Sequence, residues 1–115
     1  MRRLTVVLAA ALATLAAPAS AEVATLRCHY AGGSSNLDFT LDVDLTASTV
    51  TVVTGNPPRT VHADITDRTI TYPGYIAGWQ QRIDRRTGVW DQYTPQLGWR
   101  PNAGMCSRVE GKPVL

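Results

Sequence analysis

The stretch IDRRTGVWDQY, residues 83–93, places two adjacent arginines close to aromatic side chains. Guanidinium groups recognise anionic partners, and Tyr or Trp rings stack on sugars or anchor protein interfaces. A further tryptophan and arginine follow shortly after this stretch. We therefore expect a partner-binding surface formed by Arg85, Arg86, Tyr93, Trp99 and Arg100.

The same stretch also has a structural interpretation as a β-hairpin. A four-residue loop, residues 85–88, built on a type I turn would use Asp84 before it and Gly88 in the left-handed region. This register matches one apolar and one charged pair across the strands: Ile83 with Trp90, and Arg82 with Asp91. The two arginines of the loop are then either soluble turn residues or a partner contact, and the sequence leaves both possibilities open.

Residue types that support catalysis or metal binding occur without the spacing that these chemistries need. The sequence has no glycine-framed serine, no paired zinc-type histidines and no phosphate loop. His29 and His62 stand alone at outward strand positions, and the acidic residues of 38–44 share one strand face rather than converging on a cation. A triad of His62, Asp64 and a distant serine would need geometry that residue types do not supply. We expect no enzymatic activity, no metal and no cofactor.

Strands must position these side chains, because hydrophobic alternation of period two runs through the chain. LDFTLDVDL, residues 37–45, alternates strictly, and shorter alternating stretches occur at residues 26–30, 61–65 and 70–72. Polar turns and the GNPP segment, residues 55–58, separate them. The pattern predicts an all-β domain, a small antiparallel sandwich or barrel of about seven or eight strands.

Two finer expectations concern the C-terminal half. Trp79 and Trp90 fall on the inward face of the predicted hairpin and should belong to the core. The segment from Thr94 to Cys106 has recurrent proline and glycine and is expected to be less regular.

The first 21 residues have the features of a signal peptide. Arg2 and Arg3 form a positive region, residues 4–17 are apolar, and Ala19-Ser20-Ala21 is a small-residue cleavage signal. The apolar run is shorter than the roughly 20 residues of a spanning helix. We predict a periplasmic or secreted protein, with one β domain at residues 22–115 and no membrane span after cleavage.

Charge argues against nucleic-acid binding. The full chain has 11 Lys and Arg against 9 Asp and Glu, and loss of Arg2 and Arg3 leaves 9 against 9. Nucleic-acid binding needs an uncompensated basic cluster. The remaining charge is polarised along the chain: residues 22–67 carry six acidic side chains against two arginines, and residues 68–115 carry seven basic against three acidic.

The two cysteines predict a disulfide. Cys28 lies near the start of the expected mature chain and Cys106 near its end, and an even pair in an oxidising compartment normally pairs. Such a link would stabilise a domain of this size by roughly 4.5 kcal/mol in the chain-entropy model.

Several segments in order resemble small exported bacterial proteins of unassigned function: LRCHY, LDFTLDVDLTASTVTV, ADITDRTITY, IDRRTG and GMCS. A looser resemblance is to periplasmic lysozyme inhibitors, which are also small disulfide-tied β barrels. Their inhibitory loop centres on Ser-Gly with a following Tyr, and the matching segment here, residues 72–75, reads YPGY without a serine. The first resemblance implies an exported β domain and carries no catalytic residues. The charge split, together with the aromatic residues of the basic half, predicts a non-enzymatic domain that binds an envelope component or a protein partner. The alternative is inhibition of a periplasmic hydrolase such as lysozyme.

Overall fold

The computed structural model describes residues 22–33 and 38–109, and the predicted signal peptide at residues 1–21 lies outside this part of the chain. The described residues form strands and no helix, which confirms the all-β prediction. The strands are β1 (Val23–Tyr30), β2 (Phe39–Asp44), β3 (Thr49–Val52), β4 (Arg59–His62), β5 (Asp64–Ile65), β6 (Thr69–Pro73), β7 (Gln80–Asp84), β8 (Val89–Thr94) and β9 (Gly98–Arg108).

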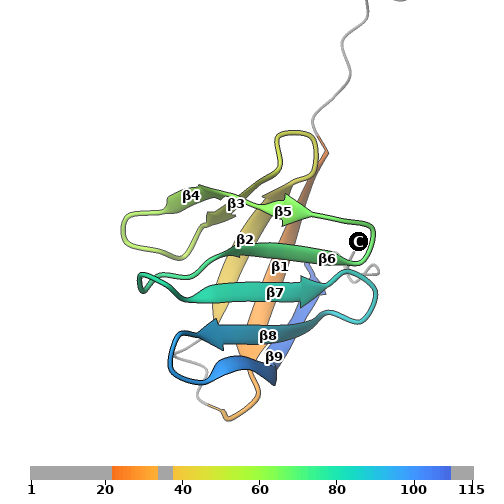
Figure 1. Cartoon of the computed structure of the whole chain (residues 1–115). Helices are drawn as coiled ribbons and strands as arrows, with labels where there is room; N and C mark the ends of the chain where they lie inside the picture. The colour runs from red at the N-terminus through yellow and green to blue at the C-terminus, as the bar shows by residue number, and fades with distance from the viewer. Residues whose placement is uncertain (1–21, 34–37, 110–115) are drawn as a thin grey trace, which may run out of the picture.

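All strands belong to one antiparallel sheet with the order β4-β3-β2-β1-β9-β8-β7-β6-β5. The chain runs up and down through β1 to β4 and again through β5 to β9, and the pairing of β1 with β9 joins the two runs. In Figure 1 the strands β5 to β8 cross in front of β1 to β3, so the sheet folds over on itself. The result is a nearly closed barrel with its core between the two layers.

The barrel closes at a bend between β4 and β5. The alternation over residues 61–65 predicts one strand, but β4 pairs with β3 whereas β5 pairs with β6 at the opposite edge of the sheet. Ala63 lies between them, is buried, and donates its backbone N–H to the carbonyl of Ser48 at 2.9 Å. One segment thus contributes both edge strands of the sheet and connects them. This division explains why nine strands form where seven or eight are predicted.

The C-terminal segment forms the longest strand, β9, so the prediction of an irregular tail is wrong. β9 pairs with β8 along one side and with β1 along the other. A register shift opposite residues 90–92 inserts extra residues into β9, and Asn102 there adopts a φ of 58°. Bulges of this kind bend a strand and accommodate residues that a regular ladder excludes, which explains why proline and glycine do not end it.

Trp90 is the largest fully buried side chain, and the backbone of β9 is shaped around it. A Cβ atom on Gly104 would collide with the Trp90 ring and with the carbonyl oxygen of His29. Only glycine allows β9 to approach this closely. The glycine that suggested a loop is therefore required by the packing of the strand.

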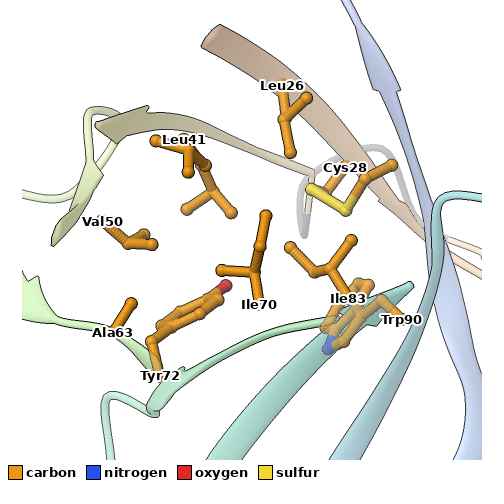
Figure 2. Packing of buried hydrophobic residues seen from close by; sticks show 11 residues of the cluster. Leu26, Cys28, Leu41, Val50, Ala63, Ile70, Tyr72, Ile83 and Trp90 are labelled. Atoms are coloured by element: carbon orange, nitrogen blue, oxygen red, sulfur yellow. A yellow bond between two sulfur atoms is a disulfide. The ribbon is translucent and has the colours of Figure 1, made fainter. Parts of the chain in front are cut away.

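The inward side chains form one core between the layers (Figure 2). Each fully buried aliphatic or aromatic side chain contributes about 1.5–3 kcal/mol relative to an exposed one. Trp79 is outside this cluster, contrary to the prediction, because it lies in the loop before β7 and is only half-buried. The buried set is Leu26, Cys28, Leu41, Val43, Val50, Ala63, Ile70, Tyr72, Ile83, Trp90 and Cys106.

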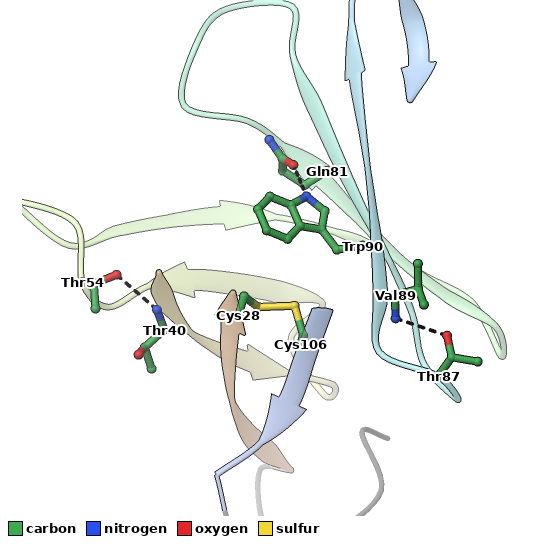
Figure 3. Close-up of a disulfide and its surroundings, with 8 residues drawn as sticks. All are labelled: Cys28, Thr40, Thr54, Gln81, Thr87, Val89, Trp90 and Cys106. Atoms are coloured by element: carbon green, nitrogen blue, oxygen red, sulfur yellow. Dashed lines mark hydrogen bonds between the residues drawn. A yellow bond between two sulfur atoms is a disulfide. The ribbon is translucent and has the colours of Figure 1, made fainter. Parts of the chain in front are cut away.

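The predicted disulfide between Cys28 and Cys106 is present. The two residues face each other across β1 and β9, with their Cα atoms 4.0 Å apart (Figure 3). The bond spans 78 residues of sequence. It covalently fastens the seam between the two runs of strands, on which the layered arrangement depends.

Candidate functional site

The hairpin between β7 and β8 ends in a turn whose polar groups bond to one another. Asp84 Oδ1 accepts hydrogen bonds from the backbone N–H groups of Thr87 at 3.0 Å and Arg86 at 2.8 Å, and these donors lower the pKa of the Asp84 carboxyl. Gly88 has a φ of 82°, as the predicted turn requires. The predicted cross-strand pairs are also confirmed: Ile83 lies opposite Trp90, and Arg82 opposite Asp91.

Arg85 fastens this hairpin to the neighbouring turn at residues 66–68. Its backbone N–H donates to the carbonyl of Arg68 at 2.8 Å, and its Nη1 donates to the carbonyl of Thr66 at 2.6 Å. The Thr66 hydroxyl in turn accepts from the N–H groups of Arg68 and Thr69. Arg85 therefore has a structural explanation, while Arg86 is an exposed cation at the tip. We call residues 66–68 and 85–88 the turn end of the barrel.

Three side chains stack on the outer face of β7, β8 and β9. The guanidinium carbon of Arg82 lies 4.0 Å from the ring centroid of Trp99, within the range of a cation–π contact. The rings of Trp99 and Tyr93 have centroids 5.4 Å apart and are tilted by 58°. Trp99 keeps 38% of its surface exposed. We call Arg82, Tyr93 and Trp99 the outer aromatic cluster.

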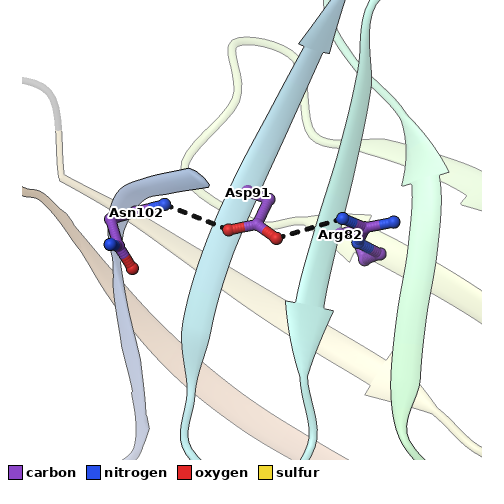
Figure 4. A network of polar contacts seen from close by, with 3 residues as sticks. All are labelled: Arg82, Asp91 and Asn102. Atoms are coloured by element: carbon purple, nitrogen blue, oxygen red, sulfur yellow. Dashed lines mark hydrogen bonds and ion pairs between the residues drawn. The ribbon is translucent and has the colours of Figure 1, made fainter. Parts of the chain in front are cut away.

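Asp91 holds this cluster in place through a bridge across three strands (Figure 4). Its Oδ2 accepts from Arg82 Nη2 at 3.1 Å, and its Oδ1 accepts from the backbone N–H of Asn102 at 3.0 Å. Asn102 is the bulged residue of β9 with positive φ. The bulge that shapes β9 therefore also supplies the donor that orients Asp91, and Asp91 positions the guanidinium over Trp99.

The five residues predicted as a partner-binding surface do not form one surface. Tyr93 and Trp99 pair across β8 and β9, as their cross-strand register requires. Arg100 follows Trp99 directly and lies opposite Gln92. Successive side chains of a strand point to opposite faces, so Arg100 is on the other face from Trp99. Arg85 and Arg86 lie at the far end of the β7–β8 hairpin. The sequence predicted only an ion pair for Arg82. Its guanidinium also stacks on Trp99, beside Tyr93.

A cavity of about 460 Å³ lies at the opposite end of the barrel from the turns. Two loops contribute to its rim, residues 53–58 and 74–79, and we call these loops and the cavity the loop end. No local pattern in the sequence predicts this site, because its walls come from strands and loops far apart in the chain. Its lining residues are Tyr30, Phe39, Val52, Gly55, Asn56, Pro57, Pro58, Arg59, Tyr72, Gly74, Tyr75, Gln81 and Trp90.

Aromatic rings packed edge to face form much of the cavity wall. The Trp90 ring centroid lies 4.6 Å from that of Tyr30 and 4.9 Å from that of Phe39. Both contacts are T-shaped, a favoured geometry for aromatic pairs. The Trp90 indole N–H donates to Gln81 Oε1, which satisfies the buried nitrogen (Figure 3). The wall is therefore both apolar and geometrically defined.

Tyr72 adds a buried phenol beneath the cavity. Its hydroxyl points into the barrel interior (Figure 2), and the residue is only 4% exposed. Burial raises the pKa of this phenol, nearby Tyr30 raises it further, and Arg59 acts in the opposite direction. The hydroxyl therefore stays protonated across the physiological pH range and remains neutral.

Three of the residues considered for metal binding, His29, Asp38 and Asp42, are engaged with other protein groups. His29 Nδ1 lies 2.6 Å from Asp38 Oδ2, and Asp42 accepts a hydrogen bond from the Thr25 hydroxyl at 2.7 Å. Within residues 22–33 and 38–109, no group of three or more His, Cys, Asp or Glu side chains converges as a metal site.

His62 and Asp64 line a second hollow, of about 380 Å³, beside Trp79. No serine is among its lining residues in the described chain. The hollow itself therefore does not hold the serine triad considered from the sequence.

Comparisons of the chain with protein-family models, with curated proteins and with solved structures found no match. The resemblances noted from the sequence therefore stay predictions. No helix with the length and apolar character of a membrane span occurs among the residues that the structure describes.

Proposed function

We propose that this chain is an exported, non-enzymatic binding domain whose outer aromatic cluster contacts a polysaccharide of the cell envelope. The observation that carries the proposal is the stacking of Arg82 on Trp99 beside Tyr93 on an outward face. Exposed Trp and Tyr rings bind the faces of sugar rings, and adjacent charged groups bond to their hydroxyls. The disulfide suits an oxidising compartment, where such polymers are found.

The cluster is preorganised, which favours binding. Arg82 is held by Asp91, and Asp91 is held by the backbone of β9. A side chain that is already ordered loses little conformational entropy when a ligand arrives, whereas ordering a free one costs about 0.5–1.5 kcal/mol. The Trp99 ring thus offers its exposed surface in one defined orientation.

Cosedimentation with insoluble peptidoglycan tests this proposal. We expect the wild-type mature domain to pellet with the polymer and Trp99→Ala to remain in the supernatant. Leu97→Ala is the matched control, because Leu97 is 66% exposed and lies in the adjacent turn but outside the cluster. Asp91→Asn should weaken binding less than Trp99→Ala, since it loosens the positioning of Arg82 without removing the ring. Equal pelleting of the wild type, Trp99→Ala and Leu97→Ala would rule the cluster out as the contact.

A second candidate function, inhibition of a periplasmic hydrolase such as lysozyme, is favoured by the loop at residues 74–79. Tyr75 is 89% exposed and Ile76 51% exposed, so the loop presents two apolar side chains to solvent. Its base is closed by a hydrogen bond from Gly74 N–H to the Trp79 carbonyl at 2.8 Å. A closed loop with projecting apolar side chains can insert into an enzyme cleft.

A panel of lysozymes separates the two candidates. Inhibition by the wild-type domain that is lost in Tyr75→Ala and retained in Trp99→Ala would support the inhibitor. Absence of any effect on the panel would count decisively against it and leave the polysaccharide proposal unaffected.

A further inference from the structure

We infer that the cavity at the loop end binds a small organic anion with an apolar body, whose carboxylate or sulfonate meets Arg59. This site is separate from the outer aromatic cluster and does not depend on the proposed function. Its volume of about 460 Å³ lies within the roughly 300–1,000 Å³ typical of small-molecule pockets.

The body of the ligand follows from the cavity wall. Tyr30, Phe39 and Trp90 present aromatic surface, and Pro57 and Pro58 add apolar surface from the rim. An apolar body that enters this space is removed from water, and each CH₂ group buried in this way strengthens binding. The edge-to-face packing of the three rings keeps the wall open without a ligand.

The charge of the ligand follows from Arg59, the single charged side chain lining the cavity in the described chain. Its Nη2 reaches the Pro73 carbonyl at 3.4 Å, and its guanidinium lies 5.8 Å from the Tyr75 ring centroid. These contacts hold the guanidinium at the rim and leave most of its N–H donors uncommitted. A cluster of aromatic rings alone would also suit an organic cation. Arg59 disfavours a cation at this site, and an anion gains a charge-assisted hydrogen bond.

Gln81 supplies a second oriented donor. The indole N–H of Trp90 can only donate, so the atom of Gln81 that it contacts must be the carbonyl oxygen, and the amide NH₂ group points elsewhere. Gly74 lies beside that nitrogen, and a Cβ atom on Gly74 would come within 3.0 Å of it. Because residue 74 is glycine, the amide donor stays uncovered at the cavity wall.

Displacement of 1-anilinonaphthalene-8-sulfonate tests the inference, since this probe is an aromatic sulfonate that fluoresces in apolar sites. We expect the folded mature domain to bind the probe at one site per molecule. Decanoate, decanol and decylamine share one apolar body and differ in charge, and we expect them to displace the probe in the order anion, alcohol, amine. An amine that displaces as well as decanoate, or failure of all three to displace the probe, would overturn the inference.

Arg59→Met separates the contribution of the charge from that of the apolar wall. It should weaken the binding of decanoate about tenfold, which is the lower end for loss of a charge-assisted hydrogen bond at a partly exposed site. The affinity for decanol should not change. Arg59→Lys should restore part of the preference for the anion. Arg86→Met is the matched control, because it removes the same charge at the turn end. Equal weakening in Arg86→Met would show that net charge, and not the cavity, attracts the anion.

Val52→Trp provides a test that does not depend on Arg59. Val52 lines the cavity from β3. A larger side chain there should fill the cavity and weaken the binding of all three competitors to a similar extent. Thermal unfolding of each variant verifies that it is folded. A folded Val52→Trp protein with unchanged binding would place the ligand outside the cavity.

Discussion

The two ends of the barrel differ in what their polar side chains contact. At the turn end, Asp84 and Thr66 accept hydrogen bonds from the backbone of their own turns, and Arg85 bonds one turn to the other. At the loop end, Arg59 and the Gln81 amide face a cavity walled by aromatic rings. At the first end the fold engages Asp84 and Arg85 and leaves Arg86 exposed at the tip, whereas at the second end Arg59 remains available to a ligand.

This difference shows why charge density along the chain is a poor guide to a site. The turn end carries adjacent arginines that stand out in the sequence, but one of them holds two turns together. The loop end has a single arginine in an unremarkable segment, and closure of the barrel places it over a hollow. A binding site forms where polar groups have hydrogen-bonding capacity that neighbouring protein groups do not use. Which groups these are depends on the folded arrangement.

The largest effect should come from the disulfide, which belongs to neither end. Replacement of both Cys28 and Cys106 by alanine should lower the free energy of unfolding by roughly 4 kcal/mol, since a long loop is then unconstrained in the unfolded chain. Urea denaturation measures this loss. Because the bond joins β1 to β9, probes placed at the two ends should report one common transition. Separate transitions would show that the two ends unfold independently and differ in stability.

The second effect is specific to the loop end and occurs in alkali. Burial raises the pKa of Tyr72, so above about pH 10 the unfolded chain releases a proton that the folded protein retains. Stability contributed by the neutral phenol is present below pH 10 and falls above it, by about 1.4 kcal/mol per pH unit. In Tyr72→Phe this alkaline loss should largely disappear. Urea denaturation at pH 8 and pH 11 measures it, with Tyr75→Phe as the exposed control. An unchanged pH dependence in Tyr72→Phe would show that this phenol is not the titrating group.

The sequence predicted features that depend on local alternation and turn chemistry. Asp84 and Gly88 specify the β7–β8 turn, and the register of Ile83 opposite Trp90 follows from it. The disulfide could be predicted from the expected oxidising compartment and from the even number of cysteines alone. Each of these inferences uses residues close in sequence, or a chemistry with one available partner.

Features that depend on barrel closure could not be predicted in the same way. Arg82 reaches Trp99 only because the bulge in β9 sets the register of that strand against β8. The cavity needs Tyr30, Arg59 and Trp90 from three separate strands. Gly104 shows the same limit, since a glycine required by close packing looks in the sequence like a chain break.

A smaller effect should appear at the turn end in acid, opposite in sign to that of Tyr72. The Asp84 carboxylate is stabilised by backbone N–H donors, so its pKa is lowered in the folded protein. Its contribution is present above the unfolded value of 3.8 and is lost as the pH falls through the lower, folded value. Asp84→Ala should cost about 1 kcal/mol at pH 7, since the bonds are solvent-accessible, and less at pH 2. Urea denaturation at the two pH values provides the measurement, with Asp67→Ala as control. Loss of probe binding at the loop end in the folded variant would show that the Asp84 turn also supports the cavity, which would contradict its assignment to the turn end alone.

The smallest effect concerns the two arginines of the tip, where the contrast between structural and available charge is most local. Arg85→Met removes the bond to the Thr66 carbonyl and should lower the free energy of unfolding by about 0.5 kcal/mol, because the contact is partly exposed. Arg86→Met removes an exposed cation, and we expect its urea midpoint to match the wild type. If the tip is also a partner contact, Arg86→Met would weaken peptidoglycan cosedimentation without changing stability. Equal stabilities for the two variants would instead show that the Arg85 bond contributes nothing, and the turn end would then hold two available charges rather than one.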